Sequence, residues 1–437
     1  MATEAESQAP AQSRGLTAAE AAALGARTRY RVLGGIMVAL GLVGFWLFTQ
    51  GIRADELSTF GLNQGGTTSA AKLPDLLLPT FATVAALSLL SVGLGAYQLW
   101  RSFGRRSTAM LGLVVLFFII AFLTWATADK SLNLVGMLKG ALLRAVPLTL
   151  GALSGILSER AGVVNIAIEG LMLSAAFMGV VVASATGSLW IGLLAAILTG
   201  ALLALVHAVL SIRYKVDQVI SGVVINIFSA GMTSFLSSRF LSEPQYAYLN
   251  SSGIFPTWAI PLLSRIPIIG GIFFESNLFT YGMFVMLVVV HLALFYTRWG
   301  LRTRAVGEHP KAADTLGINV YRMRYLAVLL SGMMAGFAGA YFTLGSVGRF
   351  DQMMTAGRGY ISLAAVIFGN WSPFGAFGAS LIFGFADALQ SRLSLLRVPI
   401  PSQFLLMAPY VATMIALAGL VGRVTPPAAD GVPYDKD

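Results

Sequence analysis

Two short polar stretches interrupt the long apolar runs of this 437-residue sequence, and the first is Ser158-Glu-Arg-Ala-Gly-Val-Val-Asn-Ile-Ala-Ile-Glu-Gly170. Its Gly162 is expected to break a helix, and Asn165 and Glu169, four residues apart, then share one face of the next helix. Because an ionisable group inside an apolar span is costly, Glu169 is expected to face a polar interior. There the pair would either tie helices together or contact a polar solute, and the sequence leaves both roles open. Arg144, in the preceding apolar run, is the only nearby basic residue that could pair with Glu169.

The second polar stretch is Val216-Asp-Gln-Val-Ile-Ser-Gly-Val-Val-Ile-Asn226. Gln218 and Ser221 share one helical face, and a further turn brings in Asn226. Amides and hydroxyls inside a span hydrogen bond either across helices or to a polar solute; helix packing is favoured for Gln218 and Ser221, whereas Asn226 is more open. The candidate solute path taken from both stretches comprises Asn165, Glu169, Gln218, Ser221 and Asn226.

A basic loop runs from Arg298 to Arg324 between two apolar runs, with six Arg or Lys residues against Glu308 and Asp314. Pro310 suits the first turn of a helix and Gly317 suits its end, so about two turns of helix fit between them. Three apolar side chains would form a small knob for a soluble partner, although a solvated basic connector is the alternative. The docking residues predicted for that partner are Gly307, Glu308, His309, Pro310, Ala312, Ala313, Asp314, Leu316 and Gly317, of which Ala312, Ala313 and Leu316 form the knob.

The composition places these stretches in a membrane protein, since 57% of the residues are hydrophobic and only 11% are charged. Runs of about 20 apolar residues recur, which is the length of a membrane-spanning helix. The net charge is +10, and the Arg and Lys residues lie beside the ends of these runs. This placement favours cytoplasmic loops that contact anionic lipid over a surface that binds nucleic acid.

The sequence lacks the residues that a metal site, a nucleotide-binding loop or an enzyme active site would need. The three histidines lie far apart and there is no cysteine, so no metal site is expected. There is no P-loop and no catalytic triad or carboxylate pair, so no enzyme activity and no cofactor in this chain are expected. A transporter driven by an external ATPase fits these absences.

The predicted fold is an all-α polytopic membrane protein with about 11–12 membrane segments. Residues 1–31 form a tail placed in the cytoplasm by the arginines before the first span, and a signal peptide is disfavoured. Residues 32–130 carry three extra spans, residues 138–422 form the main domain with the loop 298–324, and residues 423–437 form a C-terminal tail. The three extra spans are Val32–Thr49, Leu76–Leu99 and Ala109–Thr127. The segments of the main domain are Leu138–Leu157, Val163–Ala183, Leu189–Ile212, Val216–Phe240, Phe279–Tyr296, Tyr325–Leu344, Tyr360–Asn370, Pro373–Leu389 and Phe404–Val421. Tyr360–Asn370 is too short to span and is expected to be re-entrant.

Four motifs in order identify a family resemblance: the run from Glu159 to Gly170, the run from Asp217 to Asn226, Arg304-Ala-Val-Gly-Glu-His-Pro-Lys-Ala-Ala-Asp-Thr-Leu-Gly-Ile-Asn319, and Gly359-Tyr-Ile-Ser-Leu-Ala-Ala-Val-Ile-Phe-Gly-Asn-Trp-Ser-Pro373. Residues 138–422 resemble the bacterial ABC-importer permeases of the branched-chain amino acid, ribose and nucleoside type, and look closest to the nucleoside and simple-sugar permeases. The resemblance implies a type II-like importer core in the bacterial plasma membrane.

The same resemblance implies the partners: a second permease chain, commonly giving a heterodimer, a cytoplasmic ABC ATPase that binds ATP and Mg, and an extracytoplasmic solute-binding lipoprotein. It implies that the stretch from Ala312 to Gly317 is the coupling helix. A nucleoside is the expected solute, and a ribose-like sugar is the alternative within the family. An ion-coupled secondary transporter using Glu169 and Arg144 is the alternative outside it. The first 130 residues are an extension that the family core does not include.

Overall fold

The computed structural model describes residues 18–53, 55–63, 73–396, 404, 407 and 425–436. In this part of the chain nine helices are long and apolar enough to cross a membrane, so the chain is an all-α polytopic membrane protein, as predicted. The chain divides into two compact units, Met1–Gly61 with Asp75–Leu132 and Leu62–Pro74 with Asn133–Asp437. The main division therefore falls between the predicted end of the extra spans at residue 130 and the predicted start of the main domain at residue 138.

The N-terminal unit consists of α1 (Ala18–Thr49), α2 (Thr80–Trp100) and α3 (Ser107–Ala126) with a small sheet in the order β2-β1-β3. The strands are β1 (Leu57–Gly61), β2 (Leu76–Pro79) and β3 (Ser131–Asn133). No strand was predicted from the sequence, and β2 lies at the start of the predicted span Leu76–Leu99. The helices pack through small residues, since a Cβ placed on Gly95 would lie 2.7 Å from the Val38 side chain. The Phe48 ring lies 5.3–5.6 Å from the rings of Phe118, Phe122 and Trp125.

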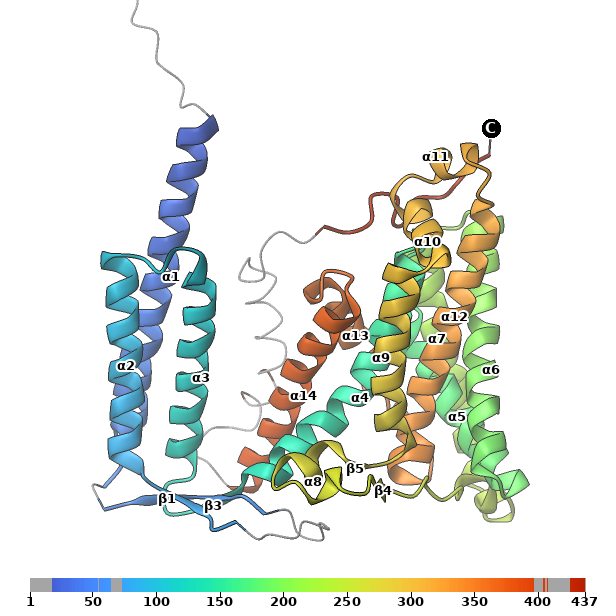
Figure 1. Cartoon of the computed structure of the whole chain (residues 1–437). Coiled ribbons are helices and arrows are strands. Elements are labelled where there is room, and N and C mark those ends of the chain that lie inside the picture. Colours follow the sequence, from blue (N-terminus) through green and yellow to red (C-terminus); the bar gives the residue numbers. More distant parts are fainter. Residues whose placement is uncertain are drawn as a thin grey trace, which may run out of the picture. The chain divides into compact units, whose positions relative to one another are not determined.

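The second unit, called the core below, is a bundle of long helices. They are α4 (Leu134–Glu159), α5 (Ile168–Thr186), α6 (Leu189–Ala208), α7 (Gln218–Leu236), α9 (Leu278–Tyr296), α12 (Val320–Ala340) and α14 (Pro373–Leu395). Shorter elements connect them: η2 (Val209–Arg213), η3 (Ser237–Leu241), η4 (Pro244–Asn250), β4 (Trp258–Ala259), η5 (Leu263–Arg265), α8 (Ile269–Phe273), β5 (Glu275–Ser276), α10 (Arg298–Glu308), α11 (Pro310–Thr315), η6 (Tyr341–Val347) and α13 (Arg358–Phe368). Figure 1 places α10 and α11 at one end of the core and α8, β4 and β5 at the other.

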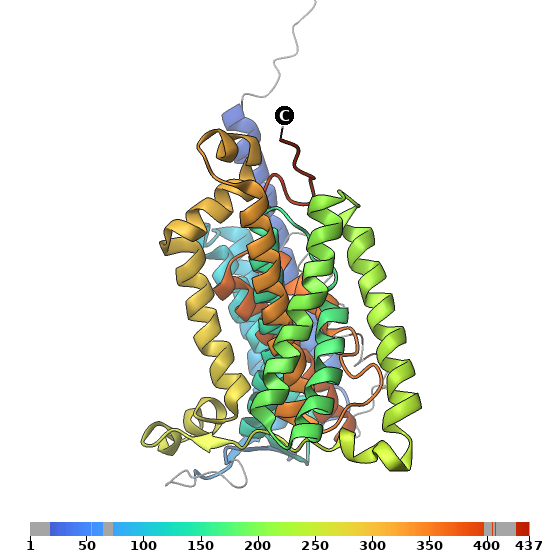
Figure 2. The same cartoon turned by 90° about the vertical axis from the view of Figure 1, so that its right-hand side faces the viewer.

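Glycines allow close helix packing in the core, and Gly332 and Gly336 lie four residues apart on one face of α12. A Cβ on Gly332 would lie 2.3 Å from the Ala204 Cβ, and one on Gly336 would lie 2.6 Å from the Ala196 carbonyl oxygen. A Cβ on Gly200 would in turn lie 2.3 Å from the Gly332 carbonyl oxygen. The backbones of α6 and α12 are therefore in direct contact, and Figure 2 shows the two helices side by side.

The last part of the core departs from simple spanning helices. The short helix α13 has 11 residues and cannot cross a bilayer, as predicted for this segment. After a tight turn at Asn370 and Trp371, both with positive φ, α14 continues for 23 residues and packs along α4. The predicted span Pro373–Leu389 lies within α14, which is not among the nine helices above. The predicted span Phe404–Val421 lies outside the described residues.

Candidate functional site

A break in the helical backbone between α4 and α5 lies at the centre of the predicted solute path. Residues 164–166 are not helical, so their backbone N–H and C=O groups need other partners inside a membrane bundle. Gln218 accepts a hydrogen bond from the Val164 N–H at 2.7 Å, and the His207 Nε2 lies 3.0 Å from the Val164 carbonyl oxygen. The other His207 nitrogen lies 3.0 Å from the Ser221 hydroxyl. Side chains of α6 and α7 thus replace the missing helical bonds.

Two asparagines complete this network. Asn226 donates to the Ile166 carbonyl oxygen at 2.9 Å and accepts from the Gly170 N–H at 2.7 Å. Asn165 donates to the Ser331 hydroxyl on α12 at 2.9 Å and accepts from the Ala167 N–H at 3.1 Å. The structure therefore brings Asn165, Gln218, Ser221 and Asn226 together around the break, and all four are at most 5% exposed.

Glu169 makes a different set of contacts, at the start of α13. Its Oε1 accepts from the Thr355 hydroxyl at 2.6 Å and from the Gly357 N–H at 2.9 Å, and its Oε2 accepts from the Gly359 N–H at 2.6 Å. A carboxylate at a helix N-terminus complements the helix dipole and the N–H groups that lack helical partners. Glu169 therefore fixes the short helix α13 against α5.

The expected pairing of Arg144 with Glu169 is wrong. The Arg144 Nε lies 3.2 Å from the Asp387 Oδ2 on α14, and its Nη2 donates to the Ser391 hydroxyl at 3.0 Å. Arg358 also approaches Asp387, at 3.6 Å. The prediction failed because it considered only neighbours in sequence, whereas α14 packs along α4 from more than 200 residues away. No sequence pattern pointed to Arg358, and Asp387 stood out only as a lone charge in an apolar run.

The turn of residues 160–163, between α4 and the break, is tied to the loop before α14. The Arg160 guanidinium donates from Nε and Nη2 to the Trp371 carbonyl oxygen at 3.0 and 2.9 Å. The Trp371 indole N–H donates in turn to the buried Glu159 carboxylate. Burial and the nearby Arg304 lower the pKa of Arg160. The motifs around Glu159 and Trp371, which the sequence placed far apart, thus form one contact.

The predicted helix in the basic loop is present as α11, Pro310–Thr315. The His309 Nδ1 caps it by accepting from the Ala312 N–H at 3.1 Å, and Gly317 follows it with φ +79°, a conformation that favours glycine. The expected apolar knob does not form as one surface. Ala313 is 3% exposed and packs inward, whereas Leu316 is 82% exposed. Helical geometry turns Ala313 toward the core because Val306, Val320 and Met323 lie there.

Residues 425–436, called the C-terminal strap below, pack against this loop. The Ala429 N–H donates to the Gly307 carbonyl oxygen at 2.8 Å, and the Ala428 N–H donates to the Glu308 carboxylate at 3.3 Å. Tyr434 is 6% exposed in the apolar cluster that also holds Ala313. The described part of the predicted C-terminal tail is thus an ordered cover of the docking loop, and Figure 1 shows its end beside α11.

Charged side chains attach the C-terminal end of the strap to two parts of the core. Lys436 pairs with Asp314 at 3.2 Å, and Asp435 pairs with Lys215, which lies between α6 and α7. Hydrogen bonds from Tyr434 and Lys436 lower the pKa of Asp314. Arg324, 1% exposed, donates to the Val432 carbonyl oxygen at 3.0 Å.

One acidic group of the strap has a pKa shifted in the opposite direction. Burial raises the pKa of Asp430 to about 7, although the Gly431 N–H and Arg324 act to lower it. Its Oδ1 is buried, and among the described residues it has no hydrogen-bond partner.

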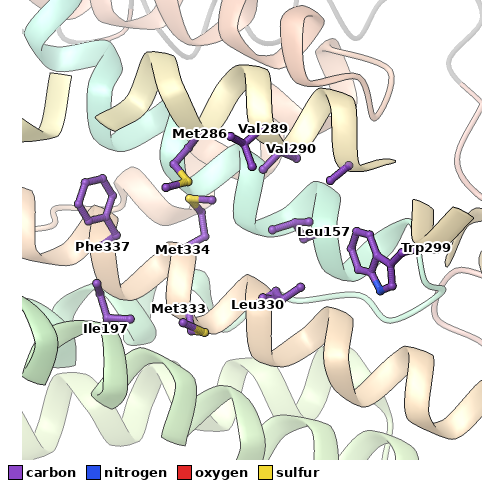
Figure 3. Close-up of a pocket in the computed structure, with 11 residues that line it drawn as sticks. Leu157, Ile197, Met286, Val289, Val290, Trp299, Leu330, Met333, Met334 and Phe337 are labelled. Carbon is purple, nitrogen blue, oxygen red and sulfur yellow. The ribbon is translucent and has the colours of Figure 1, made fainter. Parts of the chain in front are cut away.

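A cavity of about 350 Å³ lies between α9 and α12, and none of the polar residues of the break lines it (Figure 3). Its lining is apolar and includes Met286, Met334 and Phe337, with Trp299 at one end. Such a lining offers almost nothing to the hydroxyl and amide groups of a sugar or nucleoside. Within the part of the chain that the structure describes, no cluster of three metal-ligating acidic or histidine residues occurs.

Comparison with known proteins agrees with this architecture. The chain is 43% identical over 304 residues to the guanosine ABC transporter permease protein NupQ of Bacillus subtilis, covering 68% of this chain and 95% of that protein. It is 42% identical over 306 residues to the nucleoside ABC transporter permease protein NupC of Lactococcus lactis, with the same shares covered. It is 39% identical over 261 residues to the putative glucose ABC transporter permease protein TsgC13 of Haloferax volcanii, covering 59% of this chain and 77% of that protein. No solved structure matches the chain. The family model for the permease component of branched-chain amino acid transport systems matches residues 137–422, and the chain belongs to this family.

Proposed function

We propose that this permease forms the translocation path of an ATP-driven importer for nucleosides. The observation that carries the proposal is the identity of 43% and 42% to guanosine and nucleoside permeases over 95% of their length. The glucose permease relative, at 39% identity over 77% of its length, makes a simple sugar the second candidate.

The proposed orientation places the α10–α11 end of the core in the cytoplasm. Arg298, Arg302 and Arg304 lie on α10, and basic residues beside span ends favour the cytoplasmic side. The N-terminus lies on the same side in this proposal because Arg29 and Arg31 immediately precede the apolar part of α1.

A separate cytoplasmic ABC ATPase is proposed to dock at α11 and to supply ATP hydrolysis. The docking surface would be made by the exposed part of the loop, which includes Lys311, Ala312, Thr315 and Leu316. Gly307 and Ala313 would support it from inside, because Gly307 contacts the strap and Ala313 packs in the apolar cluster. Asp314, held by Tyr434 and Lys436, would fix the helix to the strap.

A movement of α11 can be transmitted to the break through direct contacts. A Cβ on Gly307 would lie 2.4 Å from the Arg160 carbonyl oxygen, so α10 rests on the turn of residues 160–163. Closure of an ATPase pair on α11 would therefore displace this turn and, through it, the break that Asn165, Gln218 and Asn226 hold. In this proposal these side chains shape the path by tying helices together, since both asparagine amides and the Gln218 carbonyl oxygen are hydrogen bonded within the protein.

The complete importer is proposed to contain a second permease chain and an extracytoplasmic solute-binding lipoprotein. The chain would be co-purified with its ATPase and these partners and reconstituted into liposomes, and uptake of labelled guanosine and glucose would be measured. Guanosine uptake that requires hydrolysable ATP is the expected result. ATP-dependent uptake of glucose alone would favour the sugar importer.

Uptake by the permease alone under an ion gradient would contradict the proposal, because an ATP-driven permease has no coupling ion. A matched variant tests the docking step in the same assay. Replacing Asp314 and Gly317 together should uncouple ATP hydrolysis from uptake while leaving insertion intact, and unchanged uptake in this variant would refute docking at α11.

A further inference from the structure

Three charged side chains meet within the core, outside the network of the α4–α5 break. Arg144 lies on α4, Arg358 begins α13 and Asp387 lies on α14. The two guanidinium groups approach the same oxygen, Oδ2 of Asp387, at 3.2 and 3.6 Å. Two cations against one carboxylate leave the cluster with a net charge of about +1 at neutral pH.

The depth of this cluster is set by Arg144. It is ten residues beyond the first residue of α4, Leu134, so it lies about 15 Å along the helix at ~1.5 Å per residue. The hydrocarbon core of a bilayer is about 30 Å thick. Arg144 therefore lies well inside a helix that is long and apolar enough to cross a membrane, and a charged side chain that faces lipid there is strongly disfavoured.

The cluster is not packed away from its surroundings. The side chains of Arg144, Asp387 and Arg358 are 34%, 32% and 30% exposed, in contrast to the buried polar groups of the break. Partly exposed charges at this depth require water or a polar solute rather than lipid beside them. The exposed face of the cluster is therefore expected to contact water or a polar solute.

The position of Arg358 is fixed by the residues on either side of it. Glu169 accepts hydrogen bonds from the Gly357 and Gly359 N–H groups, and Arg358 lies between these two glycines. A Cβ on Gly359 would lie 2.5 Å from the Glu169 backbone, so the loop is pressed against α5. Glu169 is therefore a positioning residue for Arg358. These hydrogen bonds explain why an ionisable residue, Glu169, lies within a membrane-spanning helix.

The chemistry of the cluster selects a class of solute. Guanidinium N–H groups donate to hydroxyl, carbonyl and ring-nitrogen acceptors, and the carboxylate accepts from hydroxyl groups. The excess positive charge disfavours a cationic solute.

We propose that Arg144, Arg358 and Asp387 form a solute contact site in the translocation path, which binds the hydroxyl and acceptor groups of a neutral nucleoside or sugar. This proposal rests on the function proposed above. It adds a site that lies apart from the apolar cavity between α9 and α12 (Figure 3).

The first experiment tests access to water in the permease alone, so its result does not depend on transport. The chain has no cysteine, which allows a single thiol to be introduced without background. Ser391 hydrogen bonds Arg144, so Ser391→Cys places a thiol at the cluster; Leu202→Cys, at a 62% exposed position on the apolar helix α6, is the lipid-facing control. A charged, water-soluble methanethiosulfonate reagent should modify the cysteine at 391 at least tenfold faster than the one at 202. Equal, slow modification of both would refute the hydrated site.

The second experiment tests contact with solute in the reconstituted importer. Arg358→Gln and Asp387→Asn should each lower nucleoside uptake at least tenfold, while ATP hydrolysis and co-purification of the ATPase are retained. Arg101→Gln removes a guanidinium that stacks on Trp100 in the N-terminal unit, and it should leave uptake unchanged. Wild-type uptake tests the proposed function, whereas the ratio of variant to wild type tests the site.

A variant that fails to assemble would be replaced by Arg144→Lys, which keeps the charge but not the planar donor set. Lowered uptake with this variant supports the site. Unchanged uptake in assembled Arg358→Gln and Asp387→Asn importers overturns it. Protection of the cysteine at 391 by a nucleoside supports direct contact, and an unchanged labelling rate at saturating nucleoside contradicts it.

Discussion

Replacing Glu169 by Gln tests whether this carboxylate holds α13 in place. The wild-type group accepts three hydrogen bonds, two on Oε1 and one on Oε2, at 2.6–2.9 Å. A Gln side chain keeps one acceptor oxygen and turns an NH₂ group toward a backbone N–H, so at least one bond is lost. Because a hydrogen bond to a charged group contributes about 1.5–3 kcal/mol, the variant should lose roughly that much stability. Glu169→Ala loses all three bonds and should lose about 5 kcal/mol or more.

The assay is thermal unfolding of the purified permease in detergent, followed by size-exclusion chromatography after heating. A loss of about 2 kcal/mol corresponds to a fall in the apparent melting temperature of roughly 5 °C. Glu159→Gln is the matched control, since Glu159 is 5% exposed and, within the described part of the chain, accepts a side-chain hydrogen bond only from Trp371. A Gln oxygen can accept that bond equally well, so this variant should shift the melting temperature by about 1 °C or less.

The two variants make the same chemical change at two buried positions, so the difference between them isolates the role of the hydrogen bonds. Equal melting temperatures for both would refute the claim that Glu169 fixes α13. A smaller effect for Glu169→Ala than for Glu169→Gln would also refute it, because the number of lost bonds would then not matter.

Three further predictions concern the strap and the helix contacts. Deleting the chain from Thr425 onward should lower uptake per ATP hydrolysed at least fivefold, whereas Val432→Ala, which changes an exposed side chain and keeps the carbonyl bound by Arg324, should not. Burial raises the pKa of the Asp430 carboxyl to about 7 in the docked strap. The contribution of this group to docking is therefore fully present below about pH 4, and it is lost as the carboxyl ionises and the pH rises through about 7. Protease cleavage of the strap should therefore be faster at pH 8 than at pH 5.5, and Asp430→Asn should remove the difference. Gly332→Ala should destabilise the core by forcing α6 and α12 apart, whereas Gly231→Ala, with no atom within 4 Å of its added Cβ, should be tolerated in the same unfolding assay.

Apolar run length, glycine spacing and helix start and stop residues were enough to predict much of the fold. The short helix from Pro310, the glycine after it and the non-spanning segment near Tyr360 are all present. These features are local, because a helix end or a span length is fixed by neighbouring residues. The strands β1, β2 and β3 were missed because each is only three to five residues long and β2 was included in the predicted span Leu76–Leu99. Pairing partners also cannot be identified from one strand alone.

The candidate site was predicted less completely, since side-chain partners depend on which helices pack together. Asn165, Gln218 and Asn226 were identified as unusual polar residues in spans, but their shared target, the backbone of the break, emerged only from the structure. The same reason explains the wrong partner for Arg144. A charge near the middle of a span signals a partner, and the sequence does not say which helix supplies it.

The contacts described here form a continuous mechanical route from the docking helix to the proposed solute site. α11 is fixed to the strap and, through α10, Gly307 rests on the turn that contains Arg160. That turn leads into the break and then into α5, where Glu169 holds both backbone neighbours of Arg358. The step at Gly307 is a close backbone contact and the step at Glu169 is made by hydrogen bonds of a buried carboxylate, so a displacement of α10 is passed on rather than absorbed locally. A variant that loosens one step should therefore separate ATP hydrolysis from uptake without preventing either partner from binding. This outcome distinguishes a transmission route from a set of independent stabilising contacts, which would lower assembly and uptake together.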